Sequence, residues 1–168
     1  MHKSDVGLAI QENAPISFSM KRILITAAIA ALPFSALADT FDAWSADPTK
    51  VFTSAEVDLD ELHWQLRAVV VFGEGDNDPL FLEQMELITS RIDELVERDV
   101  IVIADTDSNT LSELRKRLRP RAFMLALIGK DGGVALRKPA PWDVRELSRS
   151  IDKMPLRQQE IENRRTGE

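Results

Sequence analysis

Acidic side chains gather at two places in the sequence, each after an apolar run. Asp76 and Asp78 follow the first run, and Asp105 and Asp107 follow the second. If both runs are parallel strands, their carboxyl ends lie at one edge of a sheet, where ligands of open α/β folds usually bind. Carboxylates that converge there could hold a hard divalent cation. The same residue types are also common turn formers and helix caps, and we favour that structural interpretation.

The residue types that are absent exclude several kinds of chemistry. The chain of 168 residues has no cysteine, so it forms no disulfide, thiolate metal site or cysteine nucleophile. Its two histidines, His2 and His63, are too few for a multi-histidine metal site. Its serines lack the turn motif that exposes a hydrolase nucleophile. The sequence therefore names no catalytic residue, indicates no cofactor and favours a protein that is not an enzyme.

The charge balance narrows the class of partner. The chain carries a formal net charge of −7, and an acidic chain is a poor candidate for binding nucleic acid or an anionic membrane surface. Its basic run at 115–121 lies at the end of a predicted short helix, and we interpret it as a solvated helix end. The length of the chain indicates one domain.

Residues 20–38 have the three parts of a secretory signal peptide. A basic pair comes first, a ten-residue apolar stretch follows, and Ala36 and Ala38 have the small-x-small spacing of a cleavage site. The apolar stretch is too short to span a bilayer, which takes about 20 residues. We expect cleavage after Ala38, which makes Asp39 the first residue of a periplasmic or secreted protein that does not span the membrane.

The remaining patterns divide the chain further. Residues 1–19 are polar and precede the signal, so we expect the true start at Met20. After the signal, a mixed arm at 39–66 leads into the main domain at 67–154, and a charged tail follows at 155–168.

Apolar runs that do not alternate with polar residues predict buried strands in the main domain. A glycine-rich hairpin leads from the last of three such runs into a return strand. The four predicted strands are 67–72, 99–104, 123–128 and 134–137.

Caps and apolar spacing predict the helices between these strands. Asp78 and Pro79 open a helix whose apolar face continues for about four turns to Leu95. The segment 110–113 matches a capping box for a short helix with Leu111 on its apolar side, and a last helix covers 144–154. The predicted order is β-α-β-α-β-β-α, with a four-stranded mixed sheet flanked by helices.

This order resembles the thioredoxin-like α/β fold. Redox proteins of that fold carry Cys-x-x-Cys after the first core strand, at the start of the next helix. Here Asn77-Asp78-Pro79-Leu80 resembles that motif in position and keeps its proline, but Asn77 and Leu80 stand where the sulfurs would be. The chain is therefore not a thiol–disulfide oxidoreductase.

The stretch from Trp64 to Gln159 also resembles a narrower group, the bacterial domain-of-unknown-function family 4174. The matching pieces are the strand at 67–72, Asp78-Pro79, the glycine hairpin at 128–133 and Met-Pro-Leu-Arg-Gln at 154–158. The resemblance implies an exported thioredoxin-like domain with no assigned activity, and it implies no catalytic residue.

Two functions remain open at this point. The first is an exported, non-catalytic binding or accessory protein with a periplasmic protein partner, which it contacts through the loops 73–80 and 105–110 and the region around Pro120. The second is a metal binder or metal-dependent enzyme that uses the acidic cluster. The candidate binding residues are Asp76, Asn77, Asp78, Pro79, Asp105 and Asp107.

Overall fold

The computed structural model describes residues 39–167. The stretch 1–19, which we expect to precede the true start, and the predicted signal peptide at 20–38, with Ala36 and Ala38, lie outside the described residues. Asp39, the expected first residue after cleavage, caps the first helix by accepting the Phe41 N–H at 3.0 Å.

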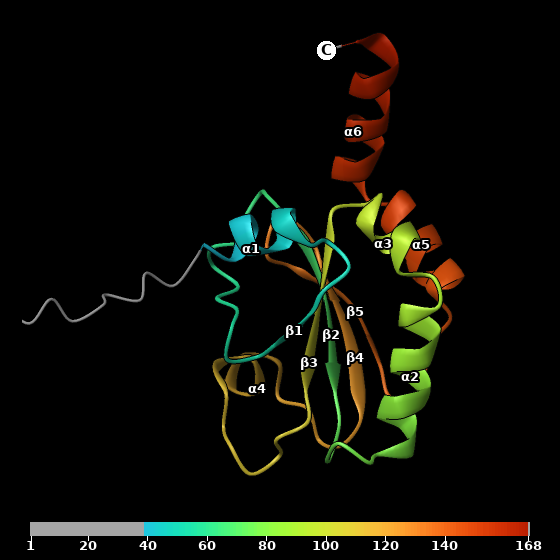
Figure 1. The fold of residues 1–168 in the computed structure, drawn as a ribbon. Helices are drawn as coiled ribbons and strands as arrows, with labels where there is room; N and C mark the ends of the chain where they lie inside the picture. Colours follow the sequence, from blue (N-terminus) through green and yellow to red (C-terminus); the bar gives the residue numbers. More distant parts are fainter. Residues whose placement is uncertain (1–38, 168) are drawn as a thin grey trace, which may run out of the picture. The chain divides into compact units, whose positions relative to one another are not determined.

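The described residues form one central sheet with helices packed around it (Figure 1). Its strands are β1 (Val51–Thr53), β2 (Arg67–Phe72), β3 (Val100–Asp105), β4 (Met124–Ile128) and β5 (Val134–Lys138). In space they follow the order β1-β3-β2-β4-β5. The first three strands in that order are parallel, whereas β4 runs antiparallel to β2 and β5 antiparallel to β4. The sheet is therefore mixed, as predicted, and the class is thioredoxin-like α/β.

The sheet has five strands, so the predicted number of four was wrong. The additional strand is β1, which lies in the predicted arm and pairs with β3 in the register Val51 to Val102. Three residues give no measurable alternation of apolar and polar side chains, so the sequence pattern could not reveal this strand. It forms because a partner distant in sequence offers it hydrogen bonds.

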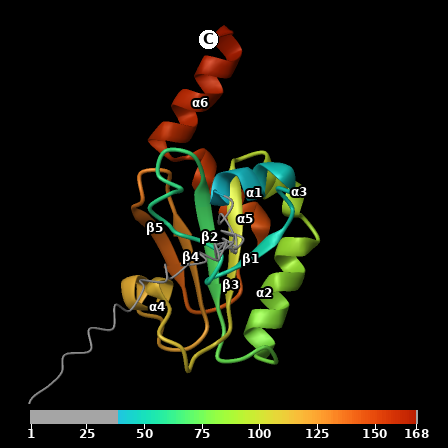
Figure 2. The same ribbon diagram turned by 60° about the vertical axis from the view of Figure 1, so that its left-hand side comes forward.

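Helices cover both faces of the sheet (Figure 1 and Figure 2). They are α1 (Thr40–Ala46), α2 (Pro79–Thr89), α3 (Ile92–Val96), α4 (Glu113–Leu118), α5 (Val144–Asp152) and α6 (Pro155–Thr166). One face packs with α1 and α4, and the other packs with α2, α3 and α5. Within residues 39–167, no helix is both long enough and apolar enough to cross a membrane.

The central strand β2 is buried along its whole length, as its unbroken apolar run predicted. Val70 and Phe72 point to the α1 and α4 side, and Val69 and Val71 point to the α2 and α5 side. This alternation is the period of two of a strand, and it places apolar side chains in both cores because both faces are covered.

The predicted four-turn helix is two helices, α2 and α3. The hydroxyl of Thr89 donates to the Met85 carbonyl at 2.8 Å, and that of Ser90 donates to the Leu87 carbonyl at 3.0 Å. Arg91 then leaves the helical region with φ −140°. Polar side chains that compete for helix carbonyls weaken the continuation, but the apolar spacing persists because both helices pack on the sheet.

The predicted capping box at Thr110 was also wrong. Ser112 caps α4 by accepting the Arg115 N–H at 3.1 Å, and the helix begins at Glu113. Thr110 instead donates its backbone N–H to Asp107, and Leu111 is 66% exposed. Several neighbouring side chains offer the same capping chemistry here, so local sequence could not choose between them.

Candidate functional site

The structure brings the two predicted loops together at the carboxyl ends of β2 and β3. The Gly73 N–H donates to the Asp105 carbonyl at 3.0 Å, and the Ser108 hydroxyl donates to the Glu74 carbonyl at 3.0 Å. The Thr106 hydroxyl donates to the Asp76 carboxylate. The two loops meet because β2 and β3 are parallel neighbours, so both strands end at the same edge of the sheet.

Asp78 serves as the N-cap of α2. Its carboxylate accepts the Glu74 N–H at 3.0 Å and the Leu80 N–H at 2.9 Å. These two backbone N–H groups, that of Glu74 first, hold the pKa of Asp78 below its ordinary value. Pro79 occupies the first turn of the helix, where no N–H is needed, so the predicted Asp78-Pro79 cap is confirmed.

Asp107 has a similar role in the second loop. Its carboxylate accepts the backbone N–H groups of Asn109 and Thr110, at 3.0 and 3.2 Å. Hydrogen bonds from the Thr110 side chain, and then from these N–H groups, lower the pKa of Asp107. The carboxylate therefore closes a turn of its own chain.

Asp105 is buried and forms an ion pair with Arg115. Arg115 Nε donates to Asp105 Oδ1 at 2.8 Å, and the side chains are 9% and 1% exposed. The Ser112 hydroxyl donates to the other carboxylate oxygen at 2.7 Å. A second guanidinium nitrogen donates to the Gly73 carbonyl at 2.9 Å, so the pair joins the ends of both parallel strands to α4.

The acidic cluster is thus built into the scaffold of this edge. Its carboxylates accept hydrogen bonds from N–H groups, hydroxyls and a guanidinium. In the part of the chain that the structure describes, no three His, Asp or Glu side chains are grouped as metal ligands. Asp78 and Asp107 have the capping and turn roles that the sequence favoured, whereas Asp105 forms a buried ion pair.

Asn77 and Leu80 occupy the positions where a redox relative would carry its sulfurs. Both are exposed at the start of α2, and Leu80 is 40% exposed. Neither side chain can form or exchange a disulfide. The helix start therefore presents an amide and an apolar side chain to solvent instead of a thiolate.

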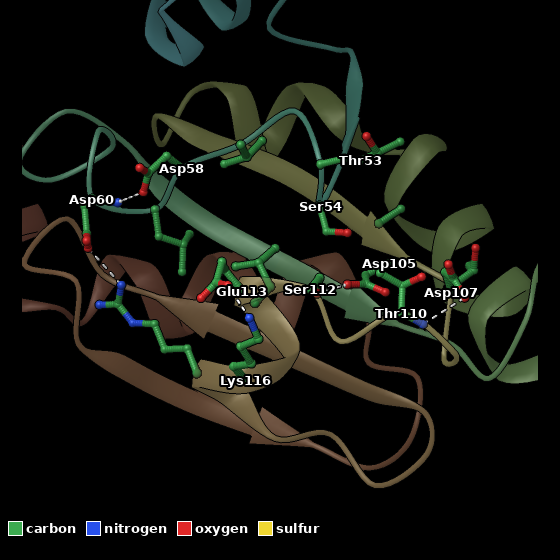
Figure 3. Close-up of a pocket in the computed structure, with 17 residues that line it drawn as sticks. Thr53, Ser54, Asp58, Asp60, Asp105, Asp107, Thr110, Ser112, Glu113 and Lys116 are labelled. Atoms are coloured by element: carbon green, nitrogen blue, oxygen red, sulfur yellow. Dashed lines mark hydrogen bonds and ion pairs between the residues drawn. The ribbon is translucent and has the colours of Figure 1, made fainter.

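A cavity of about 1000 Å³ lies between the segment 53–60 and α4 (Figure 3). Sequence reasoning missed it, because residues 53–60 were assigned to an arm without a predicted structure. Several of its charged groups neutralise one another: Arg117 contacts Asp60 at 2.9 Å, and Lys116 contacts Glu113. The larger cavity is therefore wide but offers few unsatisfied charges to a ligand.

A second cavity of about 430 Å³ lies beside the start of α2, between the segment 119–124 and the end of β5. We call it the cationic cavity. Its walls carry Arg119, Arg121, Arg137 and Lys138, and its apolar lining includes Leu80 and Phe123. Sequence reasoning placed a contact surface around Pro120, but it did not identify these cationic side chains as a group.

The sequence feature that indicates these cationic side chains is the basic run at 115–121, which was interpreted as one solvated helix end. The structure divides it instead. Arg115 points inward to Asp105, whereas α4 ends at Leu118 and Arg119 takes a left-handed conformation with φ 53°. That turn directs Arg119 and Arg121 to the cationic cavity.

A search of curated proteins finds no match. Among solved structures, the chain is similar to the mitochondrial 2-Cys peroxiredoxin from Plasmodium falciparum, with 18% identity and a TM-score of 0.42 over 67% of this chain and 85% of that chain. The family model for Domain of unknown function (DUF4174) matches residues 58–160, which confirms the resemblance seen in the sequence. The chain therefore belongs to the DUF4174 family.

Proposed function

We propose that this protein is an exported binding or accessory protein that uses a thioredoxin-like scaffold without thiol chemistry. Its contact surface is the edge formed by the loop 73–80 and the segment 119–124. The observation that carries this proposal is the cationic cavity at the start of α2, beside the helix start where Asn77 and Leu80 replace the sulfurs. Ligand sites of open α/β sheets usually lie at this edge.

The rigidity of the edge supports a binding role. The buried Asp105–Arg115 pair fixes the ends of β2 and β3, and Asp78 fixes the start of α2. A surface that is ordered before its ligand arrives loses less conformational entropy on binding. The contacts at this edge therefore support a surface that is ordered before a partner binds.

Export is supported by the signal pattern at 20–38 and by the position of the first helix. Asp39 caps α1, so cleavage after Ala38 would leave the helix with its cap. A chain without cysteine also folds independently of the redox state of its compartment.

Export is tested by expressing the full chain in a Gram-negative host and sequencing the N-terminus of the periplasmic product. We expect Asp39 as the first residue, and we expect Ala38→Arg to accumulate as uncleaved precursor because it breaks the small-x-small rule. A wild-type protein that stays in the cytoplasm with its leader intact would contradict export.

The binding role is tested in the same host by photo-crosslinking. A photoreactive phenylalanine replaces Leu80 in one sample and Val134 in another, because both side chains are 40% exposed. We expect a discrete adduct from position 80 and none from position 134, which lies at the far end of β5. Equal adducts from both positions, or none from either, would contradict the proposed surface.

A further inference from the structure

The cationic side chains of the cationic cavity have no ionic partner. Within residues 39–167, Arg119, Arg121, Arg137 and Lys138 take part in none of the ion pairs. The chain as a whole is acidic, with a formal net charge of −7, so carboxylates are plentiful elsewhere. Four unpaired cations are therefore concentrated around one cavity of an otherwise acidic protein.

By contrast, the basic side chains that precede Arg119 in the same segment are paired. Arg115, Lys116 and Arg117 all contact a carboxylate. The change comes at Arg119, where the chain leaves α4. Beyond that point, the basic side chains line the cavity and form no ion pair within residues 39–167.

Two carboxylates also line the cavity, and against its four cations they leave a formal charge of +2. Asp78 already accepts two backbone N–H groups of its own loop. Glu74 is exposed and forms no ion pair among the described residues. Lys138 lies over the Trp142 ring, with Nζ at 4.2 Å from the ring centroid, which positions its charge without cancelling it. The cavity therefore keeps a net positive charge.

The sheet explains why these side chains converge. Leu125 near the start of β4 pairs with Lys138 at the end of β5, so the segment 119–124 lies beside the end of β5. The first turn of α2 adds Leu80, and β4 adds Met124. The result is an apolar lining with cationic walls, in a volume that suits a few side chains of a ligand.

The strand next to the cavity is an edge. Among the described residues, β5 pairs with β4 alone, so the backbone groups on its other side have no strand partner. Extended peptides commonly bind such edges by adding a strand, with side-chain pockets supplying specificity. This edge leads directly to Arg137 and Lys138 in the cavity wall.

We propose that the cationic cavity binds an acidic, extended peptide segment of a partner protein. Glu or Asp side chains of the segment contact the guanidinium and ammonium groups, and an apolar side chain contacts Leu80, Phe123 and Met124. This inference rests on the proposed binding role of the same edge and adds the chemical class of the ligand.

A peptide fits these observations better than other anions do. Nucleic acid is recognised by a stripe of cations along its backbone, and here the cations line one concave site on an acidic protein. An inorganic anion would gain nothing from the apolar lining. A peptide with acidic and apolar side chains in alternation satisfies both parts of the cavity and the strand edge.

The test uses the purified protein and a fluorescent peptide of alternating Glu and Val, with a Gln and Val peptide as the matched probe. We expect the Glu peptide to bind at least about tenfold more tightly than the Gln peptide, and to weaken as salt rises. Arg121→Glu and Arg137→Glu should each weaken binding by at least about tenfold. Arg164→Glu is the control, because Arg164 is exposed on α6 and forms no ion pair among residues 39–167. Circular dichroism checks that each variant is folded.

The outcomes separate this inference from the proposed function. Equal binding of both peptides, or equal loss in Arg164→Glu, would overturn the acidic ligand. Displacement of the Glu peptide by millimolar inorganic phosphate, or tighter binding of a single-stranded oligonucleotide, would overturn a peptide ligand. If position 80 still forms its adduct in cells while Arg121→Glu leaves that adduct unchanged, the binding role stands and the ligand class fails. If no adduct forms and no peptide binds, both fail.

Discussion

The two ends of the sheet differ in how far their cationic side chains are paired. At the amino ends of the parallel strands, Arg67 and Lys130 both contact Glu160 of α6, at 2.9 and 3.1 Å. At the carboxyl ends, Arg119 and Arg121 border a cavity and pair with no carboxylate among the described residues. The amino end is therefore closed by the protein's own chain, whereas the carboxyl end keeps unpaired cations at the cavity where we propose that a ligand binds.

The closed end also holds α6 in place. Arg67 is 1% exposed and donates to the Arg98 carbonyl at 2.8 Å as well as to Glu160. Arg157 of α6 donates to the Glu97 carbonyl at 3.2 Å. Charged groups that are buried together in this way must all be paired, because any one left alone keeps its desolvation cost.

The largest expected effect is at the one buried pair of the open end. Asp105→Ala should lower the free energy of unfolding by about 3–5 kcal/mol, because it leaves the Arg115 charge buried without its partner. Urea unfolding measures this loss. The double variant Asp105→Leu with Arg115→Met should lose less than Asp105→Ala, since it removes both charges. A single variant that costs under about 1 kcal/mol would show that the pair is not structural.

A smaller effect is expected at the closed end. Glu160→Gln should cost about 1.5–3 kcal/mol, because three cations, Arg67, Lys130 and Arg157, lose a charged hydrogen-bond acceptor. Glu162→Gln on the same helix is the control, since Glu162 is 65% exposed and its ion pair with Arg165 spans 3.8 Å. That control should change stability by under about 0.5 kcal/mol in urea unfolding. Equal losses in both variants would mean that the ion pairs of Glu160 stabilise the fold no more than the exposed ion pair of Glu162 does.

The closed end should also lose stability in acid. Burial raises the pKa of Glu160, but the hydrogen bonds from Arg67 and Lys130 lower it by more. The pKa of Glu160 therefore lies below its ordinary value of 4.5. A carboxylate with a lowered pKa stabilises the fold fully above its ordinary value and loses that contribution as the pH falls through the folded value. Unfolding in urea at decreasing pH should therefore show a loss below about pH 4.5 that is shallower in Glu160→Gln. Parallel curves for the two proteins would contradict this.

The next effect compares two helix caps. Asp78→Ala should cost about 1 kcal/mol, the usual loss for an N-cap carboxylate. Asp143→Ala is matched, because Asp143 caps α5 by accepting the Arg145 N–H at 2.7 Å. Thermal melts should give similar losses, because each carboxylate accepts a backbone N–H at the start of its helix. A loss in only one of the two variants would indicate that the other carboxylate does not stabilise its helix.

The smallest expected effect concerns metal ions. Calcium, magnesium, manganese and zinc, added separately after a chelator, should leave the melting temperature unchanged, because the carboxylates of the acidic cluster accept hydrogen bonds within the chain. A bound ion at a hundred times its dissociation constant would add about 2.7 kcal/mol, which a melt detects. A shift with one cation that disappears in Asp107→Asn would restore the metal alternative.

Local patterns predicted much of this structure. The strand at 67–72 has the predicted bounds, because an unbroken apolar run has few alternatives to a doubly buried strand. The Asp78-Pro79 cap is also as predicted, since its chemistry involves neighbours within a few residues. The absence of cysteine excluded thiol exchange before any geometry was known.

Non-local contacts decided the rest. The strand β1 exists because β3 offers it hydrogen bonds, and its three residues carry no pattern of their own. Asp105 became part of the scaffold because Arg115, ten positions away, reaches back to it.

The cationic cavity shows the same division most clearly. The sequence by itself determined the fold class, the loss of thiol chemistry and a basic run at 115–121. Only the tertiary structure separated the inward Arg115 from the open Arg119 and Arg121, and brought Arg137 from another strand to join them. The physical reason is that a charge is recognisable from sequence, whereas its partner is set by chain segments that meet only in the folded sheet.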